Sequence, residues 1–250
     1  MRGRCWMAVA AVACCVAGAA KAEPGLANKV YAPYVKKHVT ELELRGGRLN
    51  GGPLEGESAA VVELEYGVND RLSLAVLAEF ERHAGEASKL DAVAVEGVVY
   101  LGQIPGLGVD VGGYLEYEQR IHNESGVLEG KLLLAKQAAP FHALLNLIAK
   151  RALTERPRED DTAFGYAAEG TIDVNPSVQI GLQAFGDLGT NRSLGGRQSH
   201  YVGPVAKWEV RPAGGHGELE IEAAYLLPLG AARGSTDGQF RLMIAYERRF

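Results

Sequence analysis

The chain has 250 residues, and its 26 lysines and arginines are outnumbered by 31 aspartates and glutamates, which gives a formal net charge of −5. This acidic balance disfavours binding to nucleic acid, because the phosphate backbone demands a basic footprint. After the first 22 residues no apolar stretch reaches the length of about 18 residues that a transmembrane helix needs, so such a helix is excluded there.

The first 22 residues have the organisation of a secretory signal peptide. Arg2 and Arg4 precede an apolar stretch (residues 6–20), and an A-x-A cleavage site ends at Ala22. A membrane anchor is disfavoured, since a spanning helix needs about 20 apolar residues. A lipid anchor at Cys14 is also disfavoured, because the leucine that usually stands three positions before such a cysteine is absent. We therefore expect export and cleavage after Ala22.

Cleavage would remove all three cysteines and three of the basic residues. The remaining 228 residues would have no thiol or disulfide chemistry, and 23 basic residues against 31 acidic ones would give a formal charge of −8. An exported chain without a transmembrane helix is either a soluble protein or a β-barrel in an outer membrane. The pattern of its strands distinguishes these two classes.

The clearest predicted strands form a hairpin. Residues 58–68 (SAAVVELEYGV) alternate between apolar and polar positions, and residues 71–81 (RLSLAVLAEFE) do so again. The intervening Asn69-Asp70 has the composition of a tight turn.

The same alternation recurs along the chain and predicts twelve strands in all. Besides the hairpin they cover residues 40–45, 91–101, 107–120, 127–137, 141–151, 163–172, 178–186, 200–210, 218–227 and 239–250. The stretch FHALLNLIAKRAL (residues 141–153) also fits helical spacing, and its alanines and leucines favour a helix. We assign it to a strand because the sorting of the loops requires one there.

The predicted connections alternate between short and long. Short turns on one side and longer loops on the other are typical of outer-membrane barrels, with the turns in the periplasm. A soluble sandwich has no reason to sort its loops in this way, and its strands are usually spaced more closely. The expected fold is a closed antiparallel transmembrane β-barrel over residues 35–250. It follows the signal peptide (residues 1–22) and a short N-terminal periplasmic segment (residues 23–34).

Three features together resemble bacterial outer-membrane β-barrel proteins: the signal peptide, the hairpin LEYGVNDRLSLAV (residues 64–76), and an aromatic residue at the end of the last alternating strand. The resemblance implies a transporter-like or porin-like protein in the outer membrane of a Gram-negative bacterium. It also implies that the barrel-assembly machinery recognises the last strand through Phe250, Tyr246 and Ile244. Arg248 departs from this pattern, because an apolar residue is usual there; at a membrane interface its charge can snorkel.

Charged residues occupy the strand positions expected to face the barrel interior. The expected lumen-lining residues are Glu63, Glu65, Arg71, Glu79, Glu116, Glu118, Lys131, Glu169, Lys207, Glu218, Glu220, Glu222 and Arg241. Acids outnumber bases in this set, which predicts a water-filled lumen that favours cations. The alternative is that acids and bases pair across a narrow barrel and fill it, as side chains do in small barrels.

Motifs for catalysis are weak. His142 is followed two residues later by Leu144, where the pattern of outer-membrane phospholipases needs a serine. Asp160, Asp161 and His200 are the residue types of outer-membrane protease sites, but a twelve-stranded barrel argues against that class. The six histidines are scattered without paired spacing, so we expect no metal and no cofactor.

We therefore predict a passive channel or transporter for small solutes, with a preference for cations. Its expected partners are outer-membrane lipid, the barrel-assembly machinery and the solutes themselves, with no nucleic acid. One alternative is a non-conducting surface barrel for adhesion or envelope structure, and another is an outer-membrane hydrolase. The predicted loops are all shorter than about 15 residues, which favours the channel over the adhesin.

Overall fold

The computed structural model describes residues 25–121, 126–153, 161–211 and 217–249. The predicted signal peptide lies outside these residues. The described chain forms a single sheet of β1 (Val39–Asn50), β2 (Ser58–Gly67), β3 (Leu72–Arg82), β4 (Lys89–Ile104), β5 (Val109–Arg120), β6 (Gly126–Ala138), β7 (Phe141–Leu153), β8 (Thr162–Asn175), β9 (Val178–Thr190), β10 (Ser193–Leu194), β11 (Ser199–Val210), β12 (Glu218–Gly230) and β13 (Gly238–Arg249). One short 3-10 helix, η1 (Ala231–Gly234), precedes the last strand.

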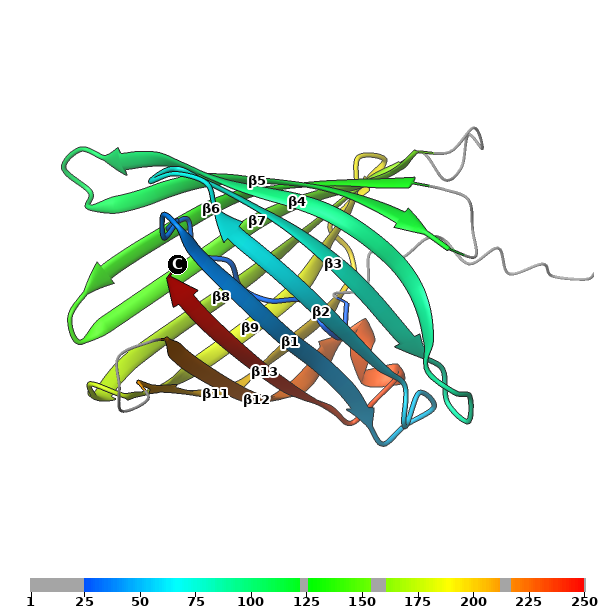
Figure 1. Ribbon diagram of the computed structural model, residues 1–250. Helices are drawn as coiled ribbons and strands as arrows, with labels where there is room; N and C mark the ends of the chain where they lie inside the picture. The colour runs from blue at the N-terminus through cyan, green and yellow to red at the C-terminus, as the bar shows by residue number, and fades with distance from the viewer. Residues whose placement is uncertain (1–24, 122–125, 154–160, 212–216, 250) are drawn as a thin grey trace, which may run out of the picture.

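The sheet closes on itself to make a barrel (Figure 1). Each long strand pairs antiparallel with the next, and β9 pairs with β11 because the two-residue β10 only folds back on β9. The first and last strands pair along their whole length, from Val39 opposite Arg249 to Asn50 opposite Gly238. Closure pairs every strand edge, which a sheet in lipid requires.

The apolar and polar residues that alternate in the sequence face the outside and the inside of the barrel, respectively. In β2, Val62 and Leu64 point outward and are 41% and 49% exposed, whereas Glu63 between them is 1% exposed. A strand turns successive side chains to opposite faces, so this period of two gives the barrel an apolar outer wall and a polar interior. The outer wall has the surface expected of a protein whose solvent there is hydrocarbon.

The predicted twelve-stranded antiparallel barrel is confirmed. The predicted strands agree with the twelve long ones, although most extend by a few residues, as β1 does to Asn50. The ambiguous stretch is strand β7 (Phe141–Leu153) and pairs with β6 and β8 over its length. Strand β10 and helix η1 were not predicted; they belong to two of the longer loops. No helix of the described residues is long and apolar enough to cross a bilayer.

The short connections and the C-terminal end of β13 lie at one end of the barrel, on the left of Figure 1, and the longer loops lie at the other. By the usual arrangement of outer-membrane barrels, the turn end is periplasmic and the loop end external. The residues before β1 do not extend from the turn end, as a periplasmic segment would. Figure 1 shows the blue chain that leads into β1 running within the ring of strands.

Candidate functional site: the lumen and the segment inside it

Residues 25–38, here called the luminal segment, cross the barrel interior from the loop end to the turn end. At the loop end, the carbonyl of Leu26 accepts a hydrogen bond from Gln239 Nε2 at 3.2 Å. The carbonyl of Ala27 accepts one from Arg45 Nε at 2.7 Å. Since the segment is not part of the sheet, the barrel wall must satisfy its backbone groups.

The middle of the segment is fixed by Tyr31. Asn146, fully buried on β7, accepts a hydrogen bond from the Tyr31 backbone N–H at 2.7 Å and donates one to its carbonyl at 2.8 Å. The Tyr31 hydroxyl donates to Glu96 at 3.1 Å. The ammonium group of Lys131 lies 4.1 Å and 4.0 Å from the ring centroids of Tyr31 and Tyr114, within cation–π range.

Lys29 places a positive charge among buried carboxylates. Its ammonium group lies 3.0 Å from both Glu43 and Glu63, and the guanidinium of Arg45 contacts the same two carboxylates. We call these four residues the central charge cluster. Glu43 and Glu63 are 2% and 1% exposed, so two carboxylates that would repel each other in a low-dielectric site are each contacted by two cations.

The segment leaves the lumen at the turn end. The Tyr34 hydroxyl donates to Asp110 at 3.1 Å, and Lys36 contacts Glu247 of β13 at 2.6 Å. Burial raises the pKa of the Tyr34 hydroxyl, and the hydrogen bond to Asp110 raises it further. His38 then turns the chain into β1 with a positive φ of 58°.

Three strand glycines leave room for the segment: Gly47, Gly112 and Gly67. A Cβ on Gly47 of β1 would lie 2.2 Å from the carbonyl oxygen of Leu26, and a Cβ on Gly112 of β5 would lie 2.7 Å from the Cβ of Pro33. The first contact is with backbone, which cannot rotate away as a flexible side chain can. The luminal segment and a side chain at position 47 therefore exclude each other.

Replacing Gly47 with valine is expected to displace the loop-end part of the segment and raise single-channel conductance in planar bilayers, on the order of twofold. The matched control is Gly170→Val on β8, because nothing lies within 4 Å of a Cβ added there. An unchanged conductance in Gly47→Val beside a folded control would show that this end of the segment does not restrict the pore.

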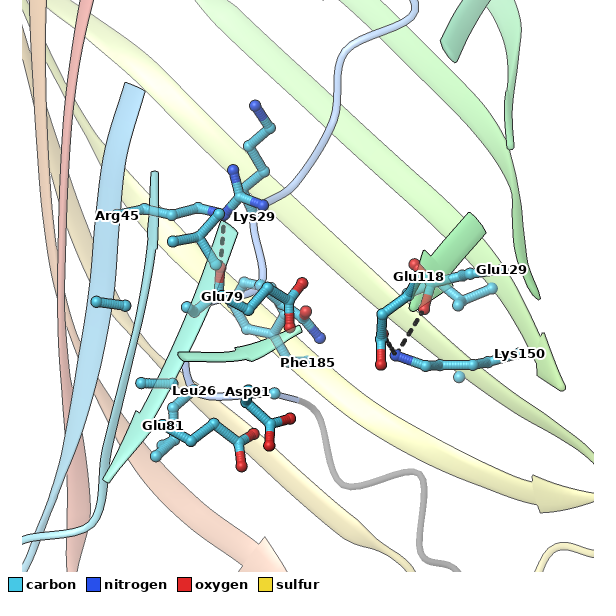
Figure 2. A pocket seen from close by; sticks show the side chains of 18 of the residues that line it. Leu26, Lys29, Arg45, Glu79, Glu81, Asp91, Glu118, Glu129, Lys150 and Phe185 are labelled. Atoms are coloured by element: carbon cyan, nitrogen blue, oxygen red, sulfur yellow. Dashed lines mark hydrogen bonds and ion pairs between the residues drawn. The ribbon is translucent and has the colours of Figure 1, made fainter. Parts of the chain in front are cut away.

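Two further networks of ion pairs connect strands of the barrel wall to one another. On one side, Lys150 contacts Glu118 at 3.1 Å and Glu129 at 3.8 Å (Figure 2). On the other, Lys207 lies 2.7 Å from Glu169 and 3.1 Å from Glu222. These contacts cross between strands that are neighbours or near neighbours, so they line the wall and do not bridge the full width of the lumen.

A cavity of about 390 Å³ lies at the loop end of the lumen, and residues 25–29 line one side of it. We call it the external vestibule. Figure 2 shows Glu79 and Glu81 of β3 and Asp91 of β4 on its wall. Among the described residues, no lysine or arginine lies within ion-pair distance of these three carboxylates. Arg120 and Lys150 also line the vestibule but make their ion pairs with Glu118, so Glu79, Glu81 and Asp91 form an acidic part of its wall without a direct ion pair to lysine or arginine in the described chain.

The structure brings most of the predicted lumen residues into the interior. Those that are buried are Glu63, Glu116, Glu118, Glu169, Glu222 and Arg241. Those that are half-buried are Glu65, Glu79, Lys131, Lys207, Glu218 and Glu220. Arg71 is exposed at the turn between β2 and β3, so it stands at the mouth of the barrel. Arg241 packs its guanidinium 4.2 Å from the ring centroid of Phe185.

The candidate catalytic residues are not brought together. His142 is on β7 near the turn end, where its Nε2 lies 2.9 Å from Asp173. His200 is at the loop end and lies 3.3 Å from the Tyr166 hydroxyl. Asp161 contacts Arg192 at 2.8 Å, and Asp160 lies outside the described residues.

Two of the three residues predicted to form the assembly signal are described. Tyr246 and Ile244 point outward from β13, opposite Leu42 and Leu44 of β1. Phe250 lies outside the described residues. Recognition of this strand by the assembly machinery remains a prediction.

Comparisons with known proteins agree on the architecture. No protein-family model and no curated protein matches the chain. An outer-membrane channel from Pseudomonas putida F1 matches with a TM-score of 0.58 and 12% identity, over 92% of this chain and 100% of that one. The NanC porin matches with a TM-score of 0.57 and 12% identity, over 84% and 100%. The KdgM porin in complex with disordered oligogalacturonate gives 0.52 and 9%, over 84% and 99%.

The fold is that of an outer-membrane porin. At identities this low the likeness establishes the architecture and leaves the family unassigned. One fold can carry many functions, so the barrel fold alone does not assign a function to this chain.

The luminal segment was not predicted from the sequence. Residues 25–38 have neither a strand alternation nor a known motif, and their partners on the wall lie up to 213 positions away in the chain. The only available signal was indirect: a lumen with an excess of buried carboxylates needs additional cations, and Lys29 supplies one.

Proposed function

We propose that the protein is a passive outer-membrane channel for small solutes, that its conductance is limited by the luminal segment, and that it prefers cations. The observation that carries the proposal is the central charge cluster, where Lys29 lies between Glu43 and Glu63 in the middle of the lumen. The wall offers two buried carboxylates inside the lumen, and the ammonium group of Lys29, from the chain itself, contacts both of them.

The acidic wall of the vestibule supports the cation preference. A solute entering from outside meets Glu79, Glu81 and Asp91 in the vestibule, whose other side is lined by residues 25–29 of the segment. Carboxylates without a direct ion pair at the entrance of a pore raise the local concentration of cations and disfavour anions. The same preference follows for organic cations, because an alkylammonium group has the chemistry of the Lys29 side chain that the wall already binds.

Purified protein in planar bilayers is expected to show a small conductance whose reversal potential in a potassium chloride gradient favours K⁺ over Cl⁻. Neutralising the vestibule with Glu79→Gln, Glu81→Gln and Asp91→Asn should reduce the permeability ratio by roughly half or more. The matched control removes three exposed acids outside the lumen, with Glu55→Gln, Asp70→Asn and Glu86→Gln. An unchanged ratio in the vestibule variant would contradict the assignment of selectivity to these residues.

The rival function is a non-conducting barrel that serves adhesion or envelope structure. It predicts no conductance from the whole chain and none from a variant that lacks the luminal segment. A hydrolase is disfavoured by the separation of His142 from His200, and we propose no catalytic reaction for the protein.

A further inference from the structure

An outward-facing pair of arginines stands at the loop end of the barrel. Arg48 of β1 is opposite Ser58 of β2, and Ser58 is opposite Arg82 of β3, so the three residues form one row across neighbouring strands. Side chains in such a row lie about 5 Å apart on the same face of a sheet. In Figure 1, β1 and β3 end at the lower right.

The row stands at the border of the apolar wall. It continues through Phe240 of β13 and Tyr225 of β12, which are 45% and 40% exposed and have the position of an interfacial aromatic girdle. Two residues further along the strands, towards the turn end, the same face holds Gly46, Ala60 and Phe80. Arg48 and Arg82 are therefore at the level where lipid head groups replace hydrocarbon.

The two guanidinium groups are close together and lack acid partners. One Nη atom of each lies 3.8 Å from the position that a Cβ on Gly56 would occupy. Nε of Arg82 is buried with no hydrogen-bond acceptor. Among the described residues no carboxylate makes an ion pair with either arginine. Ser58 and Arg82 border the vestibule together with Glu57 and Glu81, but strand parity turns the side chains of Ser58 and Arg82 to the outer face. Two like charges held together without an acid favour an anion between them.

A groove on the outer wall lies on the membrane side of this row, beyond the row of Gly46, Ala60 and Phe80. It has a volume of about 530 Å³ and an almost entirely apolar lining, which includes Val62, Val76, Ala78, Val93, Val95 and Tyr117. Val62 and Ala78 are opposite each other on the strands that carry Ser58 and Arg82, two side-chain rows from the arginines. An acyl chain in the groove would place its head group at the row.

We propose that Arg48, Ser58 and Arg82 bind the phosphate group of a lipid in the leaflet at the loop end, with one acyl chain of that lipid in the groove. Each guanidinium presents a planar fork of donors that matches phosphate oxygens, and the Ser58 hydroxyl donates between them. The outward position and the adjoining groove select a membrane lipid and not a free anion. This site lies on the outer face at the rim of the barrel, next to the vestibule, and does not depend on conduction.

The test is native mass spectrometry of the folded full barrel in detergent, with phosphatidic acid as the probe and phosphatidylcholine of the same acyl chains as its reference. Wild-type protein is expected to retain phosphatidic acid in preference to phosphatidylcholine. The variant Arg48→Gln with Arg82→Gln should reduce the retained phosphatidic acid about fivefold or more. Inorganic phosphate in excess should displace little of it, because the acyl chain contributes to binding.

The matched control is Arg197→Gln with Arg233→Gln, which removes two exposed arginines from the same end of the barrel; these bond to backbone carbonyls of Gly230 and Pro228. If both double variants lost the same amount of retained phosphatidic acid, the loss would be explained by net charge alone, and the proposed site would be wrong. Equal retention of the two lipids by wild type, or full displacement by inorganic phosphate, would also overturn the site. If the double variant does not fold, the single variants Arg48→Gln and Arg82→Gln are compared in the same way, and each is expected to lose less phosphatidic acid.

Discussion

Deleting residues 26–34 is expected to raise the single-channel conductance at least about threefold, because a twelve-stranded barrel is wide enough for an aqueous path once the chain inside it is removed. The deletion takes away Lys29 and Tyr31, which make the central contacts, and leaves Lys36 and His38 to lead into β1. The exposed carboxylates of Glu43 and Glu63 should also increase the preference for K⁺ over Cl⁻. Both quantities are measured in planar bilayers.

The control for this experiment is a deletion in a loop that stays outside the lumen. Residues 84–87 connect β3 to β4, are exposed, and do not line the vestibule, so their removal should leave the conductance unchanged. If the chain without its luminal segment conducted no better than the whole chain, side chains of the wall would have to fill the barrel. The proposal of a segment-limited channel would then fail.

Replacing Arg45 with alanine is expected to destabilise the barrel by about 3–5 kcal/mol, the usual result of removing one partner from a buried ion cluster. Arg45 contacts both Glu43 and Glu63, and it also donates to the carbonyl of Ala27. Without it, Lys29 alone faces two carboxylates. The temperature at which the barrel changes its electrophoretic mobility should fall by roughly 10 °C.

Two comparisons make this result specific. Arg71→Ala removes an equal charge from an exposed turn and should leave the transition temperature nearly unchanged, as surface substitutions usually do. Arg45→Lys keeps the charge but not the geometry of three simultaneous contacts, so its transition should lie between those of wild type and Arg45→Ala. A transition in Arg45→Ala equal to that of Arg71→Ala would show that the cluster adds little stability.

The strands could be predicted because each one alternates between apolar residues that face lipid and polar residues that face the lumen. In β2, Val62 and Leu64 meet lipid while Glu63 meets the lumen, and this contrast repeats at every second position. Residues 141–153 were ambiguous because Phe141, Leu144, Leu145 and Ile148 also fit helical spacing, and only the alternation of short and long loops decided for strand β7. Local pattern and global topology agree for all twelve long strands.

The luminal segment could not be predicted for the opposite reason. Its position depends on contacts with residues far away in the chain: Asn146 holds Tyr31 across 115 positions, and Gln239 holds Leu26 across 213. No local period records such contacts. The sequence predicted a periplasmic segment over residues 23–34, but in the described chain Leu26, Ala27 and Tyr31 are bound inside the barrel. The inward direction of the charged residues could be predicted from strand parity, whereas their pairing could not.

The central claim is that the described chain is a closed barrel whose outer wall faces hydrocarbon. Electrophoresis of the envelope-extracted protein, with and without boiling, tests it most directly, because a closed barrel resists detergent until it is heated. We expect the protein to stay with membranes through an alkaline wash, and its unboiled form to migrate at a different position from the boiled form. A chain that washes off in plain buffer and migrates identically before and after boiling would contradict the barrel, the lumen and the lipid site together.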